Sequence, residues 1–232
     1  MGYSWSFIQS QDASKHNFGI APLDKDLIIE DVKKLRPLCD LLIVSVHWSF
    51  ERETYPIPYQ RNMAHSCINN GADIIYGHHP HVLQGYEIYK NKHIFYSLGN
   101  FIFPEYGILK NYPQDQKETV IVKMQYHNSE CKINCMTPVS LKNNQQLVEG
   151  DNAASILKKL QKRSAGFLLT SKEYEIFYKK NRLRQDLPVL KSGACWDQFQ
   201  LWWWNYKKRL YYIFVKILSF LGIKELVKKL LV

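Results

Sequence analysis

The sequence contains no apolar run long enough to form a membrane-spanning helix. A span needs about twenty predominantly apolar residues, whereas the longest apolar stretch, residues 210–221, holds about twelve residues and is interrupted by Lys216. Residues 1–16 also lack the charged start and apolar core that identify a secretory signal peptide. We therefore expect neither a transmembrane span nor a signal peptide in this chain, and its compartment stays open.

Cysteine is scarce, and its spacing argues against the common cysteine-based sites. The chain has no Cys-x-x-Cys pair, so a cysteine-rich structural zinc site is not expected. Cys131 and Cys135 would share one face of an extended strand about 13 Å apart, which is too far for a disulfide. We interpret all five cysteines as ordinary thiols: Cys39, Cys67, Cys131, Cys135 and Cys195.

Positive charge is concentrated in the last third of the chain. Residues 1–150 carry 14 Lys and Arg against 15 Asp and Glu, whereas residues 151–232 carry 17 against 6. This uneven distribution of charge favours two structural units, a domain at residues 1–145 and a helical, basic, aromatic-rich tail at 146–232. The basic residues are spread over helices without a recognisable binding motif, so nucleic acid is not an expected partner.

The tail is expected to be helical. Residues 153–164 follow a capping residue at Asp151 or Asn152, and Thr170 with Glu173 forms a capping box for a helix at 171–184. Residues 195–232 combine tryptophans with lysines set among leucines. That pattern resembles an interfacial helix lying on an anionic membrane. The alternative, a C-terminal helix pair that packs on the domain with solvated lysines, stays open.

Histidines gather at residues 73–81, Asp-Ile-Ile-Tyr-Gly-His-His-Pro-His. Neutral imidazole is a common ligand for transition metals, and residues i and i+2 of an extended segment point to one side. Pro80 favours extended geometry at the preceding residue. His79 and His81 therefore form a plausible pair of metal ligands, and the alternative is a histidine-rich surface loop.

A second β-type run, residues 41–47, also ends in a histidine, His47. Between the two runs, residues 59–70 are typical of a helix that is ended by Gly71. Its apolar face comprises Met63, Ala64, Cys67 and Ile68. Strand, helix and strand form a parallel crossover, so His47 should emerge beside His79 and His81 at the edge where α/β sheets bind ligands.

The remaining pattern completes an α/β or α+β chain. Residues 24–38 predict an amphipathic helix with acids early and lysines late. Residues 86–89 and 93–98 predict a hairpin, and residues 119–126 and 132–141 two further strands that continue a sheet. The other histidines are interpreted as strand, turn or surface residues: His16, His65, His93 and His127.

Residues 19–103 contain four blocks that recur together in one known family. The blocks are Val46-His47-Trp48 with Glu51, Pro58 and Gln60; Asn70-Gly71-Ala72-Asp73; residues 77–85, Gly-His-His-Pro-His-Val-Leu-Gln-Gly; and Tyr96-Ser97-Leu98-Gly99-Asn100-Phe101. In this order they resemble the C-terminal half of the CapA family, the bacterial poly-γ-glutamate capsule synthesis proteins. Four blocks in the family's order are far more specific than a lone His-x-His.

The resemblance implies part of a calcineurin-like metallophosphoesterase αββα sandwich. It implies a divalent metal ion (Mn, Zn or Fe) and an exopolymer or phosphoester substrate. In this reading the metal ligands are His47, His79 and His81, and the catalytic candidates are His78, Glu51 and Asn100. Two positions depart from the family, with Ser49 in place of a glycine and Arg52 in place of an aromatic residue. Both departures affect the substrate pocket more than metal ligation.

Acidic residues before His47 do not form the ligand set of a two-metal site. Such a site needs carboxylates and an asparagine besides three imidazoles, and none of the upstream acids stands in a Gly-Asp or Gly-Asn-His context. We therefore expect a family protein without its N-terminal half, which a separately encoded half would complete. The acids are Asp12, Asp24, Asp26, Glu30, Asp31 and Asp40.

Three function classes follow from these observations. The first is a metal-dependent hydrolase or transfer enzyme of capsule or exopolymer synthesis, with His78 as a general acid. The second is a truncated, non-catalytic member that binds a partner. The third is a membrane-peripheral assembly subunit that acts through residues 195–232. The substrate itself is not readable from the residues.

Overall fold

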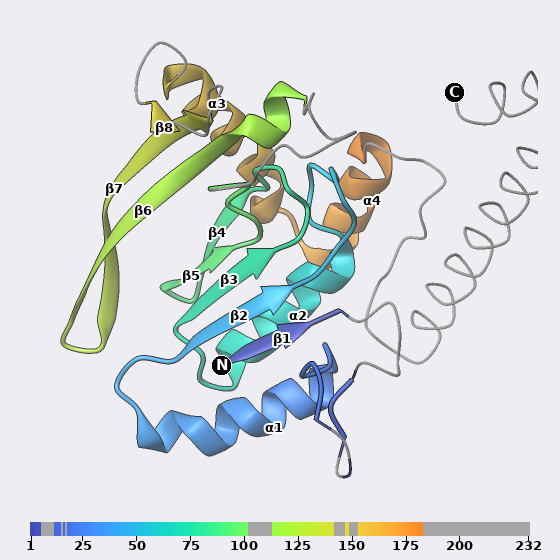
Figure 1. The fold of residues 1–232 in the computed structure, drawn as a ribbon, viewed down its shortest axis with the longest axis vertical. Coiled ribbons are helices and arrows are strands. Elements are labelled where there is room, and N and C mark those ends of the chain that lie inside the picture. The colour runs from blue at the N-terminus through green and yellow to red at the C-terminus, as the bar shows by residue number, and fades with distance from the viewer. Residues whose placement is uncertain are drawn as a thin grey trace, which may run out of the picture.

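The computed structural model describes residues 1–5, 12–14, 16, 18–101, 113–141, 147–148 and 153–182. Its first half alternates strands and helices, and its second half adds a long hairpin followed by helices (Figure 1). The elements are β1 (Gly2–Ser4), α1 (Lys25–Leu35), the 3-10 turn η2 (Arg36–Leu38), β2 (Ile43–His47), α2 (Pro58–Asn69), β3 (Ile74–His78), β4 (Tyr86–Tyr89), β5 (Lys92–Phe95), η4 (Gln114–Lys117), β6 (Glu118–His127), β7 (Glu130–Leu141), β8 (Leu147–Val148), α3 (Ala153–Ser164), η6 (Ala165–Leu168) and α4 (Ser171–Asn181).

The first sheet is largely parallel, with strand order β1-β2-β3-β5-β4. β1, β2, β3 and β5 run parallel, and β4 is antiparallel to β5. The predicted crossover from β2 through α2 to β3 is confirmed, and it pairs His47 with His78 at the carboxyl ends of the two strands. The α/β class expected from the sequence is therefore confirmed.

Capping side chains, a proline and a glycine mark the ends of the helices α1, α2 and α4. Asp24 caps α1 by accepting hydrogen bonds from the backbone of Asp26 and Leu27. Thr170 and Glu173 form the predicted capping box of α4. α2 starts with Pro58 at its first turn and ends before Gly71, whose φ of 119° suits a residue without a side chain.

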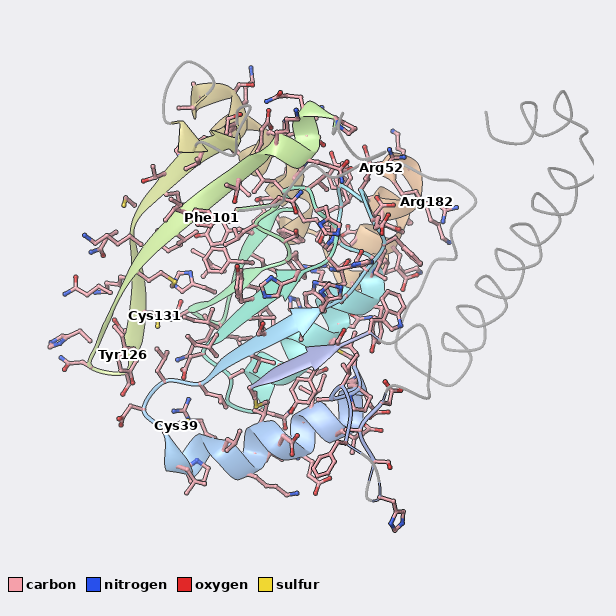
Figure 2. The ribbon with its side chains drawn as sticks, viewed as in Figure 1. Cys39, Arg52, Phe101, Tyr126, Cys131 and Arg182 are labelled. Atoms are coloured by element: carbon pink, nitrogen blue, oxygen red, sulfur yellow. The ribbon has the colours of Figure 1, made fainter. Side chains whose placement is uncertain are left out.

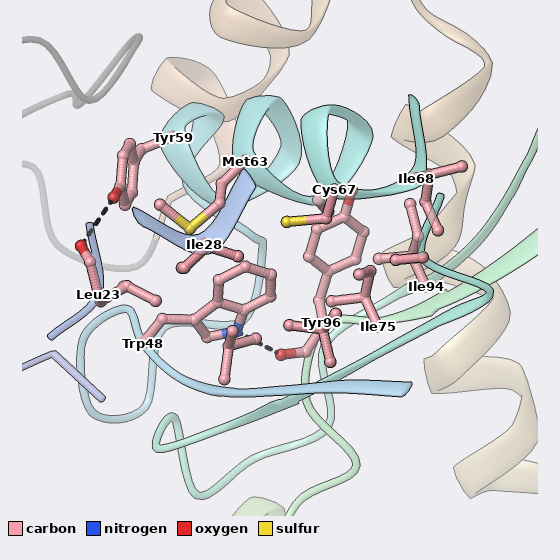
Figure 3. Close-up of a cluster of buried hydrophobic side chains, with 14 of the residues drawn as sticks. Leu23, Ile28, Trp48, Tyr59, Met63, Cys67, Ile68, Ile75, Ile94 and Tyr96 are labelled. Carbon is pink, nitrogen blue, oxygen red and sulfur yellow. Dashed lines mark hydrogen bonds between the residues drawn. The ribbon is translucent and has the colours of Figure 1, made fainter. Parts of the chain in front are cut away.

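The main hydrophobic core lies on the helical face of the first sheet (Figure 3). Trp48 and Tyr96 are fully buried there, and the Trp48 indole N–H donates to the Tyr96 carbonyl at 2.9 Å. Met63 and Cys67 of α2 pack over Ile75 of β3 in the same cluster. α4 adds the buried Tyr174 and Tyr178 to this core, whereas Ile156 and Leu160 of α3 pack in a separate small cluster with Leu83 and Val120.

The predicted strands at 119–126 and 132–141 form a second, antiparallel sheet, β6-β7-β8, instead of extending the first one. An isolated bridge pairs Gly99 with Thr119 of β6, and the Thr119 hydroxyl donates to the Leu98 carbonyl at 2.6 Å. The β6–β7 hairpin packs on the other face of the first sheet through a small cluster that includes Ile74, Phe95 and Cys131.

The prediction that Cys131 and Cys135 share a face is wrong. The register between β6 and β7 shifts at Lys123 and Met124, so β7 contains one extra residue between its two cysteines. A bulge of this kind reverses the alternation of side chains. Cys131 is buried and Cys135 is exposed. The described cysteines are free thiols, as expected, and Cys195 lies outside the described residues.

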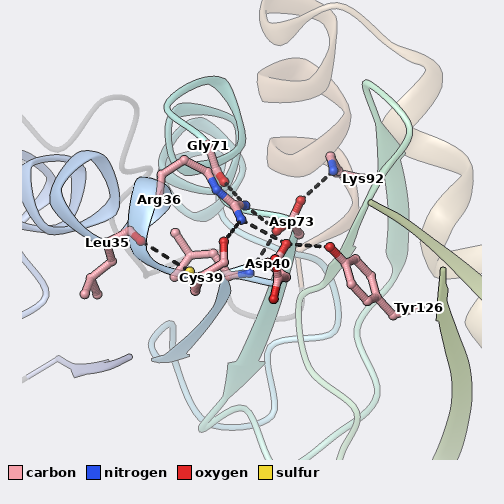
Figure 4. Close-up of polar contacts among 9 residues, drawn as sticks. Leu35, Arg36, Cys39, Asp40, Gly71, Asp73, Lys92 and Tyr126 are labelled. Carbon is pink, nitrogen blue, oxygen red and sulfur yellow. Dashed lines mark hydrogen bonds and ion pairs between the residues drawn. The ribbon is translucent and has the colours of Figure 1, made fainter. Parts of the chain in front are cut away.

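Asp73 joins α1 to the sheet at the amino-terminal edge of β3 (Figure 4). Its carboxylate accepts hydrogen bonds from Arg36, Lys92 and the backbone N–H of Leu42. Burial by itself raises the pKa of Asp73, but these donors outweigh it and hold that pKa below its usual value. This carboxylate therefore contributes to stability only while it is ionised.

In the described part of the chain, no helix is both long enough and apolar enough to cross a bilayer. The basic, aromatic stretch at 195–232 lies outside the described residues, so the two interpretations of that stretch stay predictions.

Candidate functional site

The candidate site lies at the carboxyl ends of β2 and β3. His47 is the last residue of β2, and the loop after β3 carries His79 and His81. Two backbone hydrogen bonds join the loops that follow these strands, from Trp48 N–H to the His78 carbonyl at 3.1 Å and from Arg52 N–H to the Pro80 carbonyl at 2.7 Å. The two loops therefore form one surface, as the crossover predicted.

Three imidazoles converge on this surface. The ring centroids of His47 and His79 are 4.6 Å apart, and those of His79 and His81 are 5.8 Å apart. Burial lowers the pKa of His47, and the nearby His81 lowers it further. Both effects favour the neutral ring, which is the form that binds metals.

Asn100 orients the ring of His81. The Asn100 side-chain N–H donates to the Gln116 carbonyl at 3.0 Å, so its Oδ1 is left as the acceptor that faces His81 Nδ1 at 2.9 Å. In the neutral form of the ring, this bond places the proton of His81 on Nδ1 and leaves Nε2 as the nitrogen without a proton. Such a partner of a ligand histidine fixes the ring and its tautomer, so Asn100 is placed to act through His81.

The expectation that residues 79–81 are extended is wrong. His79 has φ 95° and His81 has φ 59°, so both lie in the left-handed region. A strand that ends in a tight loop must reverse the chain there, and the preference imposed by Pro80 does not outweigh that demand. The rings nevertheless converge, because the turn brings them together. Ser49 and Arg52, on the facing loop, also have positive φ.

His78 belongs to the face of the sheet opposite the main core. Its Nε2 lies 3.0 Å from Ser45 Oγ, and its ring packs edge-on against Tyr76 with centroids 4.0 Å apart. Burial lowers the pKa of His78, and the neighbouring His47 contributes to this. Ser45 and Tyr76 were not anticipated as neighbours of His78. The signal was available in the alternation of β2 and β3, which places all three side chains on one face.

Glu51 is exposed on the loop after β2. The structure gives it no hydrogen bond or ion pair with another described residue, so it is near the histidines in the chain but is not joined to them. Among the predicted catalytic residues, Asn100 lies within hydrogen-bond distance of His81, and His78 pairs with His47 across the two strands. Their catalytic roles stay predictions.

Two glutamines from the matching blocks support the site from within. Gln60 accepts from the Ile57 backbone N–H and donates to Gln84, and Gln84 donates to the Glu53 carbonyl. Both amides are fully buried. Buried amides whose oxygen and nitrogen both have partners hold neighbouring segments in one arrangement, so Gln60 and Gln84 fix the loop that follows β2.

As the side chains lie, the described residues contain no group of three or more His, Cys, Asp or Glu side chains arranged to hold a metal ion. The chemistry of the donors nevertheless fits a borderline divalent ion, because His47 and His79 are adjacent and His81 presents Nε2. A metal centre that uses these imidazoles stays a prediction, and its other ligands would have to be supplied.

Comparison with known proteins places this site in a recognised family segment. Residues 3–105 match the sequence model of the family described as bacterial capsule synthesis protein PGA_cap. The chain is 38% identical over 109 residues to the capsule biosynthesis protein CapA of Bacillus anthracis, covering 45% of this chain and 26% of that protein. It is 41% identical over 93 residues to the PGA biosynthesis protein CapA of Bacillus subtilis, covering 40% and 24%.

A third relative is a probable polyglutamine synthesis accessory protein of Mycobacterium tuberculosis, 35% identical over 69 residues, covering 30% of this chain and 18% of that protein. The chain thus spans about a quarter of the length of the two CapA proteins that it matches. The resemblance to the CapA family is confirmed over residues 3–105, a stretch that contains every candidate site residue. The parallel-rich sheet with its helices is consistent with a metallophosphoesterase-like α/β fold.

Proposed function

We propose that this chain, whose residues 3–105 match the bacterial capsule synthesis protein family, contributes the imidazole half of a divalent metal centre that acts in capsule or poly-γ-glutamate synthesis. The substrate would be an exopolymer or a phosphoester, and the reaction a hydrolysis or group transfer. The remaining metal ligands would come from the N-terminal half of the domain, whether it precedes these residues in the same chain or is separately encoded. The names of the relatives support a role in capsule or poly-γ-glutamate synthesis, and the geometry of the histidines supports metal binding.

One observation carries the metal proposal. Two loops from neighbouring parallel strands bring His47, His79 and His81 together, with ring centroids 4.6 and 5.8 Å apart. A histidine-rich surface loop would not require a second histidine from another strand, or a buried amide that orients one of the rings. A bound divalent ion would lower the pKa of its water and polarise the scissile group.

The chain's own residues would have separate tasks. His47 and His79 would bind the ion side by side, and His81 would bind through Nε2 while Asn100 holds its Nδ1 proton. His78, hydrogen-bonded to Ser45, would stand beside the ligands as the general acid for a leaving group.

Metal titration tests this proposal. Zn²⁺ or Mn²⁺ binding would be measured by equilibrium dialysis with elemental analysis, for the full chain and for the double variant His79→Ala/His81→Ala. The matched control is His16→Ala/His127→Ala, which removes two exposed imidazoles outside the site. We expect the site variant alone to lose the bound ion. Equal metal content in the wild-type chain and the site variant would reject the metal centre.

A second candidate is a non-catalytic binding or membrane-peripheral assembly subunit. It is favoured by the incomplete ligand set among the described residues and by the excess of Lys and Arg in residues 151–232. Turnover separates the two candidates. Hydrolysis of a generic phosphodiester that depends on added Mn²⁺ or Zn²⁺ supports the enzyme, whereas bound metal without turnover supports the assembly subunit.

A further inference from the structure

We infer that Arg52 is an anion-binding residue at the histidine site and receives an oxyanion of the substrate, a carboxylate or a phosphate group. This inference rests on the proposed function for the location of the site. It adds a class of substrate, and it explains why a guanidinium stands at a position where the family resemblance leads one to expect an aromatic residue.

The backbone places Arg52 at the site. Its N–H donates to the carbonyl of Pro80, the residue between His79 and His81, at 2.7 Å. Figure 2 labels Arg52 on the loop that follows β2, at the end of the sheet to which β2 and β3 run. A long side chain that starts one hydrogen bond away from the histidine loop has the reach to meet a group bound there.

The surroundings of Arg52 do not explain its charge. Its side chain is exposed, and the structure gives its guanidinium no ion pair or hydrogen bond with another described residue. The exposed arginine therefore adds nothing evident to the stability of the described fold. By contrast, the buried Arg61 contacts Glu87 and the Phe167 carbonyl, and Arg163 contacts Asp115.

The backbone of Arg52 is also strained. Its φ is 63°, in the left-handed region where glycine or asparagine is at home. Strained positions of this kind cluster at binding and catalytic sites. Together with Ser49, His79 and His81, Arg52 is one of four residues with positive φ on the two facing loops.

The chemistry of arginine selects the class of ligand. Guanidinium is always charged and offers a planar pair of donors that matches a carboxylate or a phosphate. On the surface that carries His47, His79 and His81, Arg52 would add a fixed positive charge. An aromatic residue there would recognise an apolar or stacked group instead, so this substitution changes the specificity of the site.

Binding of defined anions tests the inference. The full-length wild-type chain and the variant Arg52→Ala would be titrated by calorimetry with a γ-linked glutamate oligomer, which carries carboxylates only, and separately with inorganic tripolyphosphate. The loss of one charged hydrogen-bonding partner should weaken binding about tenfold. Arg52→Lys should restore part of the affinity, because it keeps the charge and loses the planar fork.

The chain offers a matched control in Lys90→Ala. Lys90 is an exposed cation with φ 51° in the β4–β5 turn, at the opposite end of the parallel strands, so its replacement removes the same charge from the same kind of backbone. Thermal unfolding of each variant checks that the fold is kept. We expect Lys90→Ala to leave anion affinity within twofold of the wild-type value.

Each outcome decides the inference. An Arg52-dependent affinity for the oligomer or for tripolyphosphate supports it and identifies which oxyanion is preferred. No binding of either anion by the wild-type chain, unchanged affinity in Arg52→Ala, or an equal loss in Lys90→Ala overturns it. Metal content measured in the same samples separates the two proposals, since a chain without metal that still shows Arg52-dependent binding loses the proposed function and keeps this inference.

Discussion

The side-chain oxygen of Asn100 lies 2.9 Å from Nδ1 of His81, and the same carboxamide donates to the Gln116 carbonyl. The second bond determines which end of the amide faces the ring, and therefore which tautomer the neutral ring of His81 adopts. The buried amide of Asn100, in the chain after β5, thus sets the tautomer of His81, in the loop after β3.

Replacing Asn100 with alanine should lower the affinity for Zn²⁺ about tenfold to a hundredfold, the usual cost of losing the partner that orients a ligand histidine. The measurement is a competition titration against a chelator of known affinity. Asn69→Ala, at an exposed asparagine at the end of α2, is the control and should leave the affinity unchanged. Equal affinities for wild type and Asn100→Ala would show that Asn100 does not act through His81.

Replacing Ser49 with glycine should stabilise the protein by about 1 kcal/mol, because it removes both a strained backbone conformation and a buried hydroxyl without a partner. Ser49 has φ 74°, and its fully buried hydroxyl has no hydrogen-bond partner among the described residues. The measurement is the midpoint of urea unfolding at an unchanged slope.

The control for Ser49 is Ser129→Gly, at a residue with φ 63° in the exposed β6–β7 turn. This substitution relieves the same backbone strain without removing a buried hydroxyl. It should therefore raise the free energy of unfolding by less than Ser49→Gly does. A destabilised Ser49→Gly protein would mean that the hydroxyl has a stabilising partner.

Replacing Gly77 with alanine should destabilise the fold by at least about 3 kcal/mol, because the new methyl group overpacks a closed site. A Cβ at this position would lie 2.1 Å from the Tyr96 carbonyl oxygen and 2.5 Å from Trp48 Nε1. Gly2→Ala is the control, since its Cβ would meet no atom closer than 3.8 Å. A shift of less than 1 kcal/mol in chemical unfolding of Gly77→Ala would contradict the close packing of β3.

The pH dependence of stability should change when Asp73 is replaced with asparagine. The folded-state pKa of Asp73 lies below its ordinary value of 3.8, so its contribution is present above that value and is lost as the pH falls through the folded-state pKa. Asp73→Asn should cost about 2 kcal/mol at pH 7 and less below pH 4, because it leaves Arg36 and Lys92 without their charged partner.

Urea unfolding of both proteins at several pH values gives this measurement. Glu30→Gln is the control, because the exposed Glu30–Lys34 pair on α1 contributes little. A loss for Asp73→Asn that stays the same from pH 7 to pH 3 would show that the charge of Asp73 is not the stabilising element.

The basic tail is predicted to bind anionic membranes. Replacing Lys224, Lys228 and Lys229 with glutamate should abolish sedimentation of the full chain with phosphatidylserine vesicles at low salt. Replacing the exposed lysines Lys158, Lys162 and Lys179 with glutamate makes the same change in charge on the described helices and should have a smaller effect. Equal losses in the two triple variants would favour a general charge effect over an interfacial helix.

Local pattern was enough for most of the fold around the site. The apolar runs before His47 and His78, the helix between them and its stop at Gly71 all follow from side-chain periodicity and backbone preference, and the parallel crossover follows from their order. The bulge in β7 was not predictable in this way, because an extra residue in a strand leaves the composition unchanged and is decided by pairing with β6.

The candidate site, too, was predictable in part from the sequence and in part only from the tertiary structure. The chemistry of His47, His79 and His81 and their meeting at one sheet edge follow from the sequence, because the residue types and the order of the elements are written there. The left-handed backbone of His79 and His81, the orientation of His81 by Asn100 and the contact of Arg52 with Pro80 depend on loops that fold against each other. Such contacts join residues 19 to 28 positions apart, and only the tertiary structure decides them, because local preferences act over a few residues.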